Sequence, residues 1–228
     1  MNKMINEMVD LQNKMNKKVT DDWVSKNYDW NLALVMETAE SIDSFCWKWW
    51  KKGEPDINNF VVEMVDMWHF ILSLGIQNEY NINKIVIDKA NDILEFQKLN
   101  YENEEFDFEI DETQTIHYLK NMIFNAMVPH FKLGEFETIV YNFLNVWYRF
   151  LTLDIYDLYK FYMTKNQLNL FRQTHGYKTG EYIKNWNGSE DNVTAFRIAS
   201  DLHVTEHFME DVEKELETYY TENVLNAE

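Results

Sequence analysis

Hydrophobic residues recur along most of the chain at the spacing of amphipathic α-helices. The apolar residues of the first segment share one helical face: Met4, Met8, Leu11 and Met15. A second helix is predicted over residues 31–51, and the turn that carries Gly53 and Pro55 predicts its end. The amino-terminal part of the chain is therefore expected to form two consecutive helices.

A third helix, predicted over residues 59–77, is apolar around nearly its whole circumference. Such a helix is buried on almost all sides. At about 100° per residue, its remaining polar residues fall within about one third of the helical circle. They are mostly Glu63, Asp66, His69 and Ser73. One polar stripe therefore runs along a helix that is otherwise buried.

The rest of the chain predicts more helices and one distinctive loop. The helices are expected over residues 115–131, 135–153, 155–174 and 193–220. The loop between the last two contains half of the glycines, which are Gly176, Gly180 and Gly188, and this indicates a specific shape or function. Residues 81–114 include an acidic run and are expected to form a solvated excursion instead of a second domain.

Composition favours a single all-α domain. The 228 residues include only two prolines and six glycines, and no alternating strand pattern occurs. A formal net charge of −18 would repel nucleic-acid backbones and anionic membranes, so we expect neither direct nucleic-acid binding nor membrane association. Charges interrupt the apolar runs before the ~20 residues that cross a bilayer. The single cysteine, Cys46, excludes an intramolecular disulfide and favours the reducing cytoplasm.

Two pairs of carboxylates stand out on the second and third helices. Glu37 and Glu40 are three residues apart, as are Glu63 and Asp66, so each pair projects from one helical face. If the two helices are antiparallel neighbours, all four carboxylates converge and require a cation, because an unpaired buried ion costs several kcal/mol. Hard oxygen ligands without cysteine select Mg²⁺, with Mn²⁺ as the alternative ion.

Two other interpretations of the carboxylates compete with a metal site. In the first, the pairs are solvent-facing acids on amphipathic helices, but the third helix has so much apolar surface that little of it can be exposed. The second is a di-iron carboxylate bundle, which needs Glu-x-x-His pairs. Here Asp66 occupies the position three residues after Glu63 where that motif has its histidine, and His69 follows three residues later.

Basic residues gather near the carboxyl end of the chain. Within residues 165–188 the only acid is Glu181, in contrast to the acidic chain as a whole. Lys165, Asn169 and Arg172 share one helical face, which suits a metal-bound polyphosphate. The alternative is that the helix macrodipole alone favours cations at a helix C-terminus.

The carboxylate motifs resemble those of a known enzyme family. The chain has "ETAE" at 37–40 and "EMVD" at 63–66, separated by 22 residues. This pattern resembles the all-α NTP pyrophosphatase superfamily, which includes MazG-like and dCTP pyrophosphatases. The segments around the motifs, together with residues 165–192, resemble the dimeric all-α dUTPase branch over nearly the whole chain. The resemblance implies a helical bundle of this type, one dUTPase domain over residues 1–228 and a homodimer.

The resemblance also implies a reaction and its catalytic residues. Glu37, Glu40, Glu63 and Asp66 would hold two or three Mg²⁺ ions, and a water would attack the α-phosphorus of dUTP to give dUMP and diphosphate. Glu37 or Glu40 would act as base or orient the water. The enzyme would also accept dUDP and would limit uracil incorporation into DNA.

Substrate-binding positions are implied residue by residue. The uracil edge would meet Gln12 and Asn16, Trp49 would pack on the base or sugar, and His69 would contact the sugar and reject ribose. The phosphate clamp and lid would consist of Lys165, Asn169, Arg172, Tyr177 and Lys178, with Lys48 as a weaker candidate.

Two alternative functions follow from the same resemblance. One is the same chemistry on another base such as dCTP, since only the base-binding residues need to differ. The other is an added role in binding a repressor protein, as in phage-encoded members of the family, with the acidic tract 102–112 as the contact. A phage-encoded enzyme would act in the cytoplasm of the host cell.

Overall fold

The structure of the chain, a computed structural model, describes residues 1–103 and 109–225. Regular structure in these residues is almost entirely helical, which confirms the all-α prediction. The exception is a short antiparallel pair of strands, β1 (Asn185–Trp186) and β2 (Ser189–Glu190). The chain divides into two compact units, Met1–Tyr156 and Asp157–Glu228, which are described separately.

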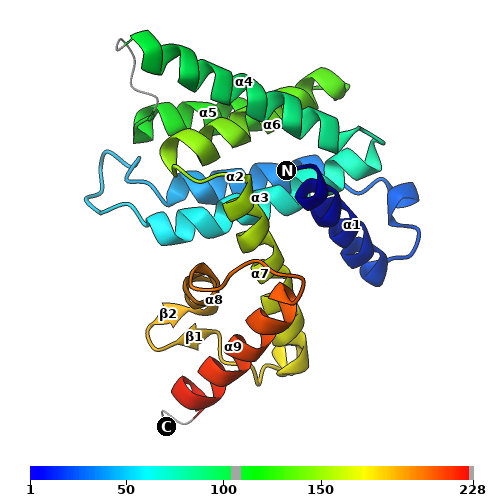
Figure 1. The fold of residues 1–228 in the computed structure, drawn as a ribbon, viewed down its shortest axis with the longest axis vertical. Helices are drawn as coiled ribbons and strands as arrows, with labels where there is room; N and C mark the ends of the chain where they lie inside the picture. Colours follow the sequence, from blue (N-terminus) through cyan, green and yellow to red (C-terminus); the bar gives the residue numbers. More distant parts are fainter. Residues whose placement is uncertain (104–108, 226–228) are drawn as a thin grey trace. The chain divides into compact units, whose positions relative to one another are not determined.

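The first unit is a helical bundle (Figure 1). Its helices are α1 (Asn2–Val19), α2 (Trp30–Asp43), α3 (Ile57–Gln77), α4 (Ile82–Asn103), α5 (Glu112–Ala126) and α6 (Leu133–Asn145). A 3₁₀ turn (Trp23–Lys26) lies between α1 and α2, and a π-helical turn (Val146–Phe150) follows α6. Helix α3 contacts α1, α2, α4 and α6, while α2 also packs on α5 and α4 on α6. The bundle is therefore assembled around α3.

Helix α3 is central because its apolar circumference is buried, as the sequence predicts. Trp68 has no exposed surface and stacks on Phe143 of α6, with ring centroids 5.1 Å apart. By length and composition α3 is also apolar enough to cross a membrane, contrary to our expectation for the apolar runs. However, 67% of its most apolar window is buried inside the protein, as in the core helix of a soluble protein.

The second helix ends earlier than its sequence pattern predicts. It stops at Asp43 instead of residue 51, because Ser44 forms the base of the loop 44–56. The backbone N–H of Asp56 donates to the Ser44 carbonyl at 2.9 Å, and the Asn59 side chain donates to the Ser44 hydroxyl at 2.9 Å. These contacts join residues distant in sequence, so helical periodicity does not reveal them.

Helix α4 occupies most of the segment 81–114, where we expected a solvated excursion. It buries Ile85, Val86, Ala90 and Ile93, and it packs on α6. Residues 104–108, the centre of the acidic tract 102–112, lie outside the described residues. At the end of that tract, the Asp111 side chain accepts from the Gln114 backbone at 2.8 Å in a capping box that begins α5.

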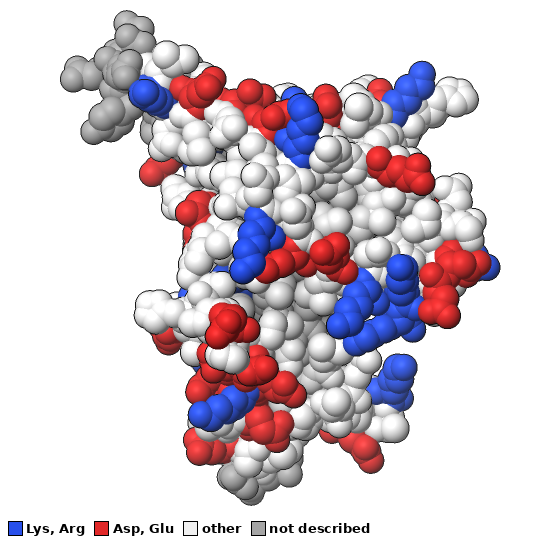
Figure 2. All heavy atoms as spheres, turned by 45° about the vertical axis from the view of Figure 1, so that its right-hand side comes forward, with Lys and Arg blue, Asp and Glu red and all other residues white. Residues whose placement is uncertain are grey.

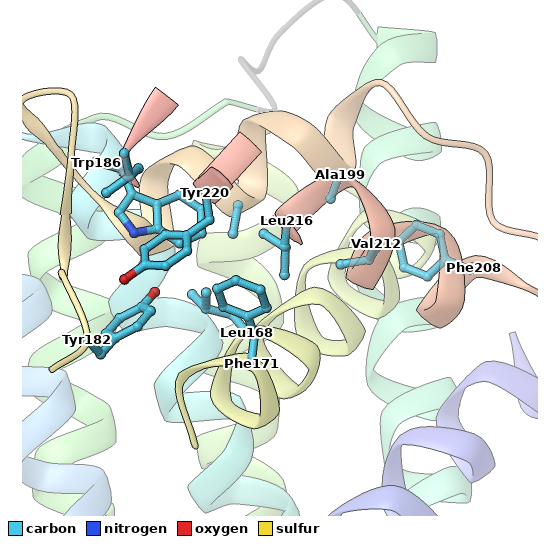
Figure 3. Packing of buried hydrophobic residues seen from close by; sticks show 11 residues of the cluster. Leu168, Phe171, Tyr182, Trp186, Ala199, Phe208, Val212, Leu216 and Tyr220 are labelled. Carbon is cyan, nitrogen blue, oxygen red and sulfur yellow. The ribbon is translucent and has the colours of Figure 1, made fainter. Parts of the chain in front are cut away.

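The second unit contains most of α7 (Ile155–Thr174), a 3₁₀ turn (Tyr177–Thr179), β1, β2, α8 (Asp191–Ser200) and α9 (Phe208–Asn223). Its core joins these elements through Leu168, Phe171, Trp186, Leu216 and Tyr220 (Figure 3). The predicted last helix, 193–220, is thus two helices. The chain turns back after Ser200 because the apolar stripe of α9 must pack on α8.

Gly75 allows α3 and its neighbours to approach closely, which gives a first prediction. A Cβ atom at this position would lie 2.6 Å from Ile82 and 2.8 Å from Phe136. We expect Gly75→Ala to destabilise the protein by about 1–2 kcal/mol, because overpacking outweighs the better helix propensity of alanine. Urea denaturation measures this, with the exposed Gly134→Ala at the start of α6 as the control. A stabilised Gly75→Ala variant would contradict the packing.

Candidate functional site

Three of the four predicted carboxylates come together between α2 and α3. The carboxylate oxygens of Glu37, Glu63 and Asp66 lie within 4.8 Å of one another. Glu63 is buried, with 9% of its surface exposed, and the other two are half-buried. Hard oxygen donors at this spacing fit a divalent cation of the Mg²⁺ or Mn²⁺ class.

The fourth carboxylate, Glu40, lies outside this cluster. It is on α2, one turn beyond Glu37, and its side chain is exposed. The intervening Thr38 is buried, and its hydroxyl donates to the Leu34 carbonyl at 2.6 Å. The structure therefore brings Glu37 to α3 and leaves Glu40 at the surface of the helix.

The close carboxylates perturb one another. Burial, the negative charge of Asp66 and a hydrogen bond with Glu63 raise the pKa of Glu37 to about 8. At neutral pH the metal-free cluster therefore holds a proton on Glu37. A divalent cation bound by Glu37 would have to displace this proton, because a carboxylate must be ionised to act as a ligand.

A second polar cluster joins α1 to α3. The side chains of Gln12 and Asn16 are buried, with 6% and 9% exposed. The Gln12 amide donates to Asn16 Oδ1 and to Ser73 Oγ, both at 3.0 Å, and the Asn16 amide donates to Ser73 Oγ at 2.9 Å. These amides are therefore part of a buried network and do not face solvent.

His69 belongs to the same network. Its Nδ1 lies 2.9 Å from Gln12 Oε1, and because that oxygen only accepts, Nδ1–H is the donor. The Ser73 hydroxyl donates to the His69 carbonyl at 2.9 Å. Ser73 was missed as a site residue, although its position four residues after His69 in the polar stripe was the available signal. We refer to Gln12, Asn16, His69 and Ser73 as the amide network.

The carboxylate cluster and the amide network share helix α3. At about 1.5 Å of rise per residue, Asp66 and Ser73 are about 10 Å apart along the helix axis. The polar stripe predicted from the sequence therefore connects the carboxylate cluster at one end to the amide network at the other. Both sites belong to the first unit.

The loop 44–56 carries the other candidates of the first unit. Lys48 is paired with Asp43, and Trp49 is 89% exposed and packs edge-on against Trp50 at 5.4 Å. The loop encloses a cavity of about 280 Å³ that Lys48, Lys51 and Lys52 help to line. The structure places neither Lys48 nor Trp49 in the carboxylate cluster or the amide network.

The remaining candidates meet in the second unit. Arg172 forms an ion pair with Asp191 at 2.7 Å, and its Nη1 donates to Asn169 Oδ1 at 3.1 Å. Lys165 donates to Asn192 Oδ1 at 3.1 Å. Asp191 and Asn192 lie in the segment 165–192 that resembles the family, but their contacts with Arg172 and Lys165 were not predicted, because a contact from α7 to α8 has no local sequence signal.

Tyr177 and Lys178 follow α7 in the short 3₁₀ turn and are exposed. The guanidinium of Arg172 lies over the Tyr177 ring, 6.0 Å from its centroid. Tyr177 therefore extends the polar group around Arg172 to the surface of the unit, with Lys178 beside it in sequence.

Comparison with known proteins decides the family. A family model described as dUTPase matches residues 4–177, which is most of the chain. The chain belongs to the all-α dimeric dUTPase family. Members of this dUTPase family are dUTP diphosphatases, enzymes that hydrolyse dUTP, and dUTPases generally use a divalent metal ion. The carboxylate cluster has the oxygen donors that such an ion requires. No curated protein matches the chain in sequence.

The proton on Glu37 predicts how the stability of this dUTPase depends on pH without metal. The raised pKa means that the folded state holds a proton that the unfolded chain releases above about pH 4.5. The free energy of unfolding should therefore fall as pH rises from about 5 to about 8, and Glu37→Gln should reduce this fall. Thermal unfolding in EDTA measures it.

Glu40→Gln is the matched comparison, since the exposed Glu40 is on the same helix outside the cluster and its charge is the smallest of the effects that raise the pKa of Glu37. It should leave the pH dependence of the unfolding temperature close to that of the wild type. Adding Mg²⁺ at about pH 8 should stabilise the wild type more than Glu37→Gln. Equal pH dependence in all three proteins would contradict the perturbed carboxylate.

The buried hydroxyl of Ser73 supports a separate prediction. We expect Ser73→Ala to destabilise the protein by about 1–3 kcal/mol, because the Gln12 and Asn16 amides lose a buried acceptor. Thr138→Ala is the control, since the exposed Thr138 hydroxyl makes the same type of bond, to Gly134 four residues earlier. Chemical denaturation of both variants should give a clearly larger loss for Ser73→Ala, and equal losses would argue against the network.

Proposed function

We propose that the chain is a Mg²⁺-dependent dUTPase that converts dUTP to dUMP and diphosphate, also accepts dUDP, and thereby limits uracil incorporation into DNA. The observation that carries this proposal is the shared helix α3, with Glu63 and Asp66 at one end of its polar stripe and the amide network at the other. A nucleotide has the same two-part chemistry, with anionic phosphates at one end and an amide-like base at the other.

The catalytic roles are assigned to the carboxylates. Glu37, Glu63 and Asp66, together with Glu40, would hold two or three Mg²⁺ ions, which supply a water of lowered pKa and neutralise phosphate charge. Glu37 or Glu40 would take the proton of this water or orient it for attack on the α-phosphorus. The half-buried position of Glu37 supports a role at the cluster, and the exposed position of Glu40 supports access to a second ion.

Recognition of the base is assigned to Gln12 and Asn16, and recognition of the sugar to His69. Their mutual hydrogen bonds hold the side chains in place before substrate arrives, which reduces the entropy lost on binding. Two amides supply both donors and acceptors, and these complement the donor and acceptor groups on the edge of uracil.

The phosphates are assigned to Lys165, Asn169, Arg172, Tyr177 and Lys178, with Lys48 and Trp49 as further contacts. The family match supports this assignment, because it runs from residue 4 to residue 177 and so continues past Tyr156, where the first unit ends. On the same ground we propose that residues 1–228 act as one catalytic domain.

The active form is proposed to be a cytoplasmic homodimer. Apolar side chains are exposed on two packed helices and support a self-association surface: Leu32 and Met36 of α2, Phe124 of α5, and Met127 directly after α5. The net charge of −18 supports the absence of direct nucleic-acid and membrane binding. Figure 2 shows acidic side chains spread over the visible face, with basic ones grouped in a few places.

The proposed function predicts the result of a substrate panel. With Mg²⁺, the purified protein should release diphosphate from dUTP and far less from dCTP, dTTP and UTP, and EDTA should abolish the release. Glu37→Gln should lower kcat by about a hundredfold or more, because it removes a ligand of the metal cluster. Release measured by a coupled diphosphate assay tests all of these points. Preference for dCTP, or activity in EDTA, would overturn the substrate or metal assignment.

A further inference from the structure

Asp191, at the first turn of α8, is completely enclosed, and both of its carboxylate oxygens are bonded. Arg172 donates from Nε to Oδ2 and from Nη2 to Oδ1, both at 2.7 Å. The Tyr182 hydroxyl donates to Oδ2 at 2.8 Å, and the Asn192 backbone N–H donates to Oδ1 at 2.9 Å. A carboxylate has about four lone-pair sites, so these bonds saturate it.

This saturation fixes the orientation of Arg172. Two parallel bonds between a guanidinium and a carboxylate set the plane of the guanidinium as well as its position. They occupy Nε and Nη2, and Nη1 is directed to Asn169. Only 12% of the Arg172 side chain is exposed. The guanidinium edge that remains for a ligand is therefore the one at Nη1, next to Asn169.

The same contacts extend to a second cation. Asn192 Oδ1 accepts from Arg172 Nη2 at 3.0 Å and from Lys165 Nζ at 3.1 Å. Asn192 follows Asp191 in the chain, so one turn of α8 holds two of the three cationic side chains of α7, Lys165 and Arg172. The family match ends at residue 177, before Tyr182, Asp191 and Asn192.

We propose that Asp191 is a positioning residue that orients Arg172, and through Asn192 also Lys165, for binding of the nucleotide phosphates. This inference rests on the proposed assignment of Arg172 to the substrate. A guanidinium held in its binding orientation loses little freedom when the phosphate arrives, whereas a released one would turn away towards water. The carboxyl-terminal part of the chain thereby contributes to substrate affinity without touching the substrate.

The competing explanation is a purely structural ion pair between α7 and α8, and enzyme kinetics separate the two. Asp191→Asn keeps the shape and removes the charge, and we expect it to raise KM for dUTP about tenfold or more while kcat changes less. Binding of inorganic tripolyphosphate, measured by calorimetry, should weaken by a similar factor. Tyr182→Phe removes one of the four bonds and should raise KM by about two- to fivefold.

Leu216→Ala is the matched control, because it weakens the core of the same unit and removes no polar group. It should lower the unfolding temperature and leave KM unchanged. If Asp191→Asn and Tyr182→Phe behave like this control, the positioning role is overturned while dUTP hydrolysis by the wild type stands. A wild type that neither hydrolyses dUTP nor binds tripolyphosphate would overturn the proposed function and this inference together.

Discussion

The burial of carboxylates on a core helix is the constraint on which the first unit depends. Helix α3 is apolar around almost its whole circumference, yet it carries Glu63 and Asp66 where α2 packs against it and brings Glu37. Negative charges so close together in a half-buried place are unfavourable unless a proton or a cation compensates them. Helices α1 and α2 both pack on α3 and both supply polar side chains to its polar stripe.

Because the carboxylates and the amide network belong to one helix, their separation is set by covalent geometry. A helix has a fixed rise per residue, so the distance from Asp66 to Ser73 varies little as loops move. The bonds among Gln12, Asn16 and Ser73 then hold α1 against this helix. Such rigidity keeps the carboxylate cluster and the amide network at a fixed separation.

Local patterns in the sequence predicted the features that depend on local structure. The burial of α3, its polar stripe and the limits of α7 at Ile155 and Thr174 agree with the periodicity. Three carboxylates of the predicted four converge, whereas Glu40 is exposed. The spacing of three residues is the same in both pairs, so the packing of α2 on α3, which the spacing does not reveal, decides which carboxylates meet.

Long-range contacts explain what the sequence did not predict. The early end of α2 depends on hydrogen bonds from Asp56 and Asn59 to Ser44, and the break after α8 depends on the packing of α9. The enclosure of Asp191 likewise joins residues 19 positions apart. Periodicity describes one element at a time, so contacts that define where two elements meet are outside its reach.

The proton shared by the carboxylates has a consequence for the life of the protein in the cell. A cluster that required a metal to neutralise its charge could only fold where that metal was plentiful. With Glu37 protonated, the bundle can instead fold without metal, so synthesis and metal supply need not coincide. An ion that bound to the folded cluster would release this proton, and the maturation of the enzyme would then be an exchange of one small cation for another.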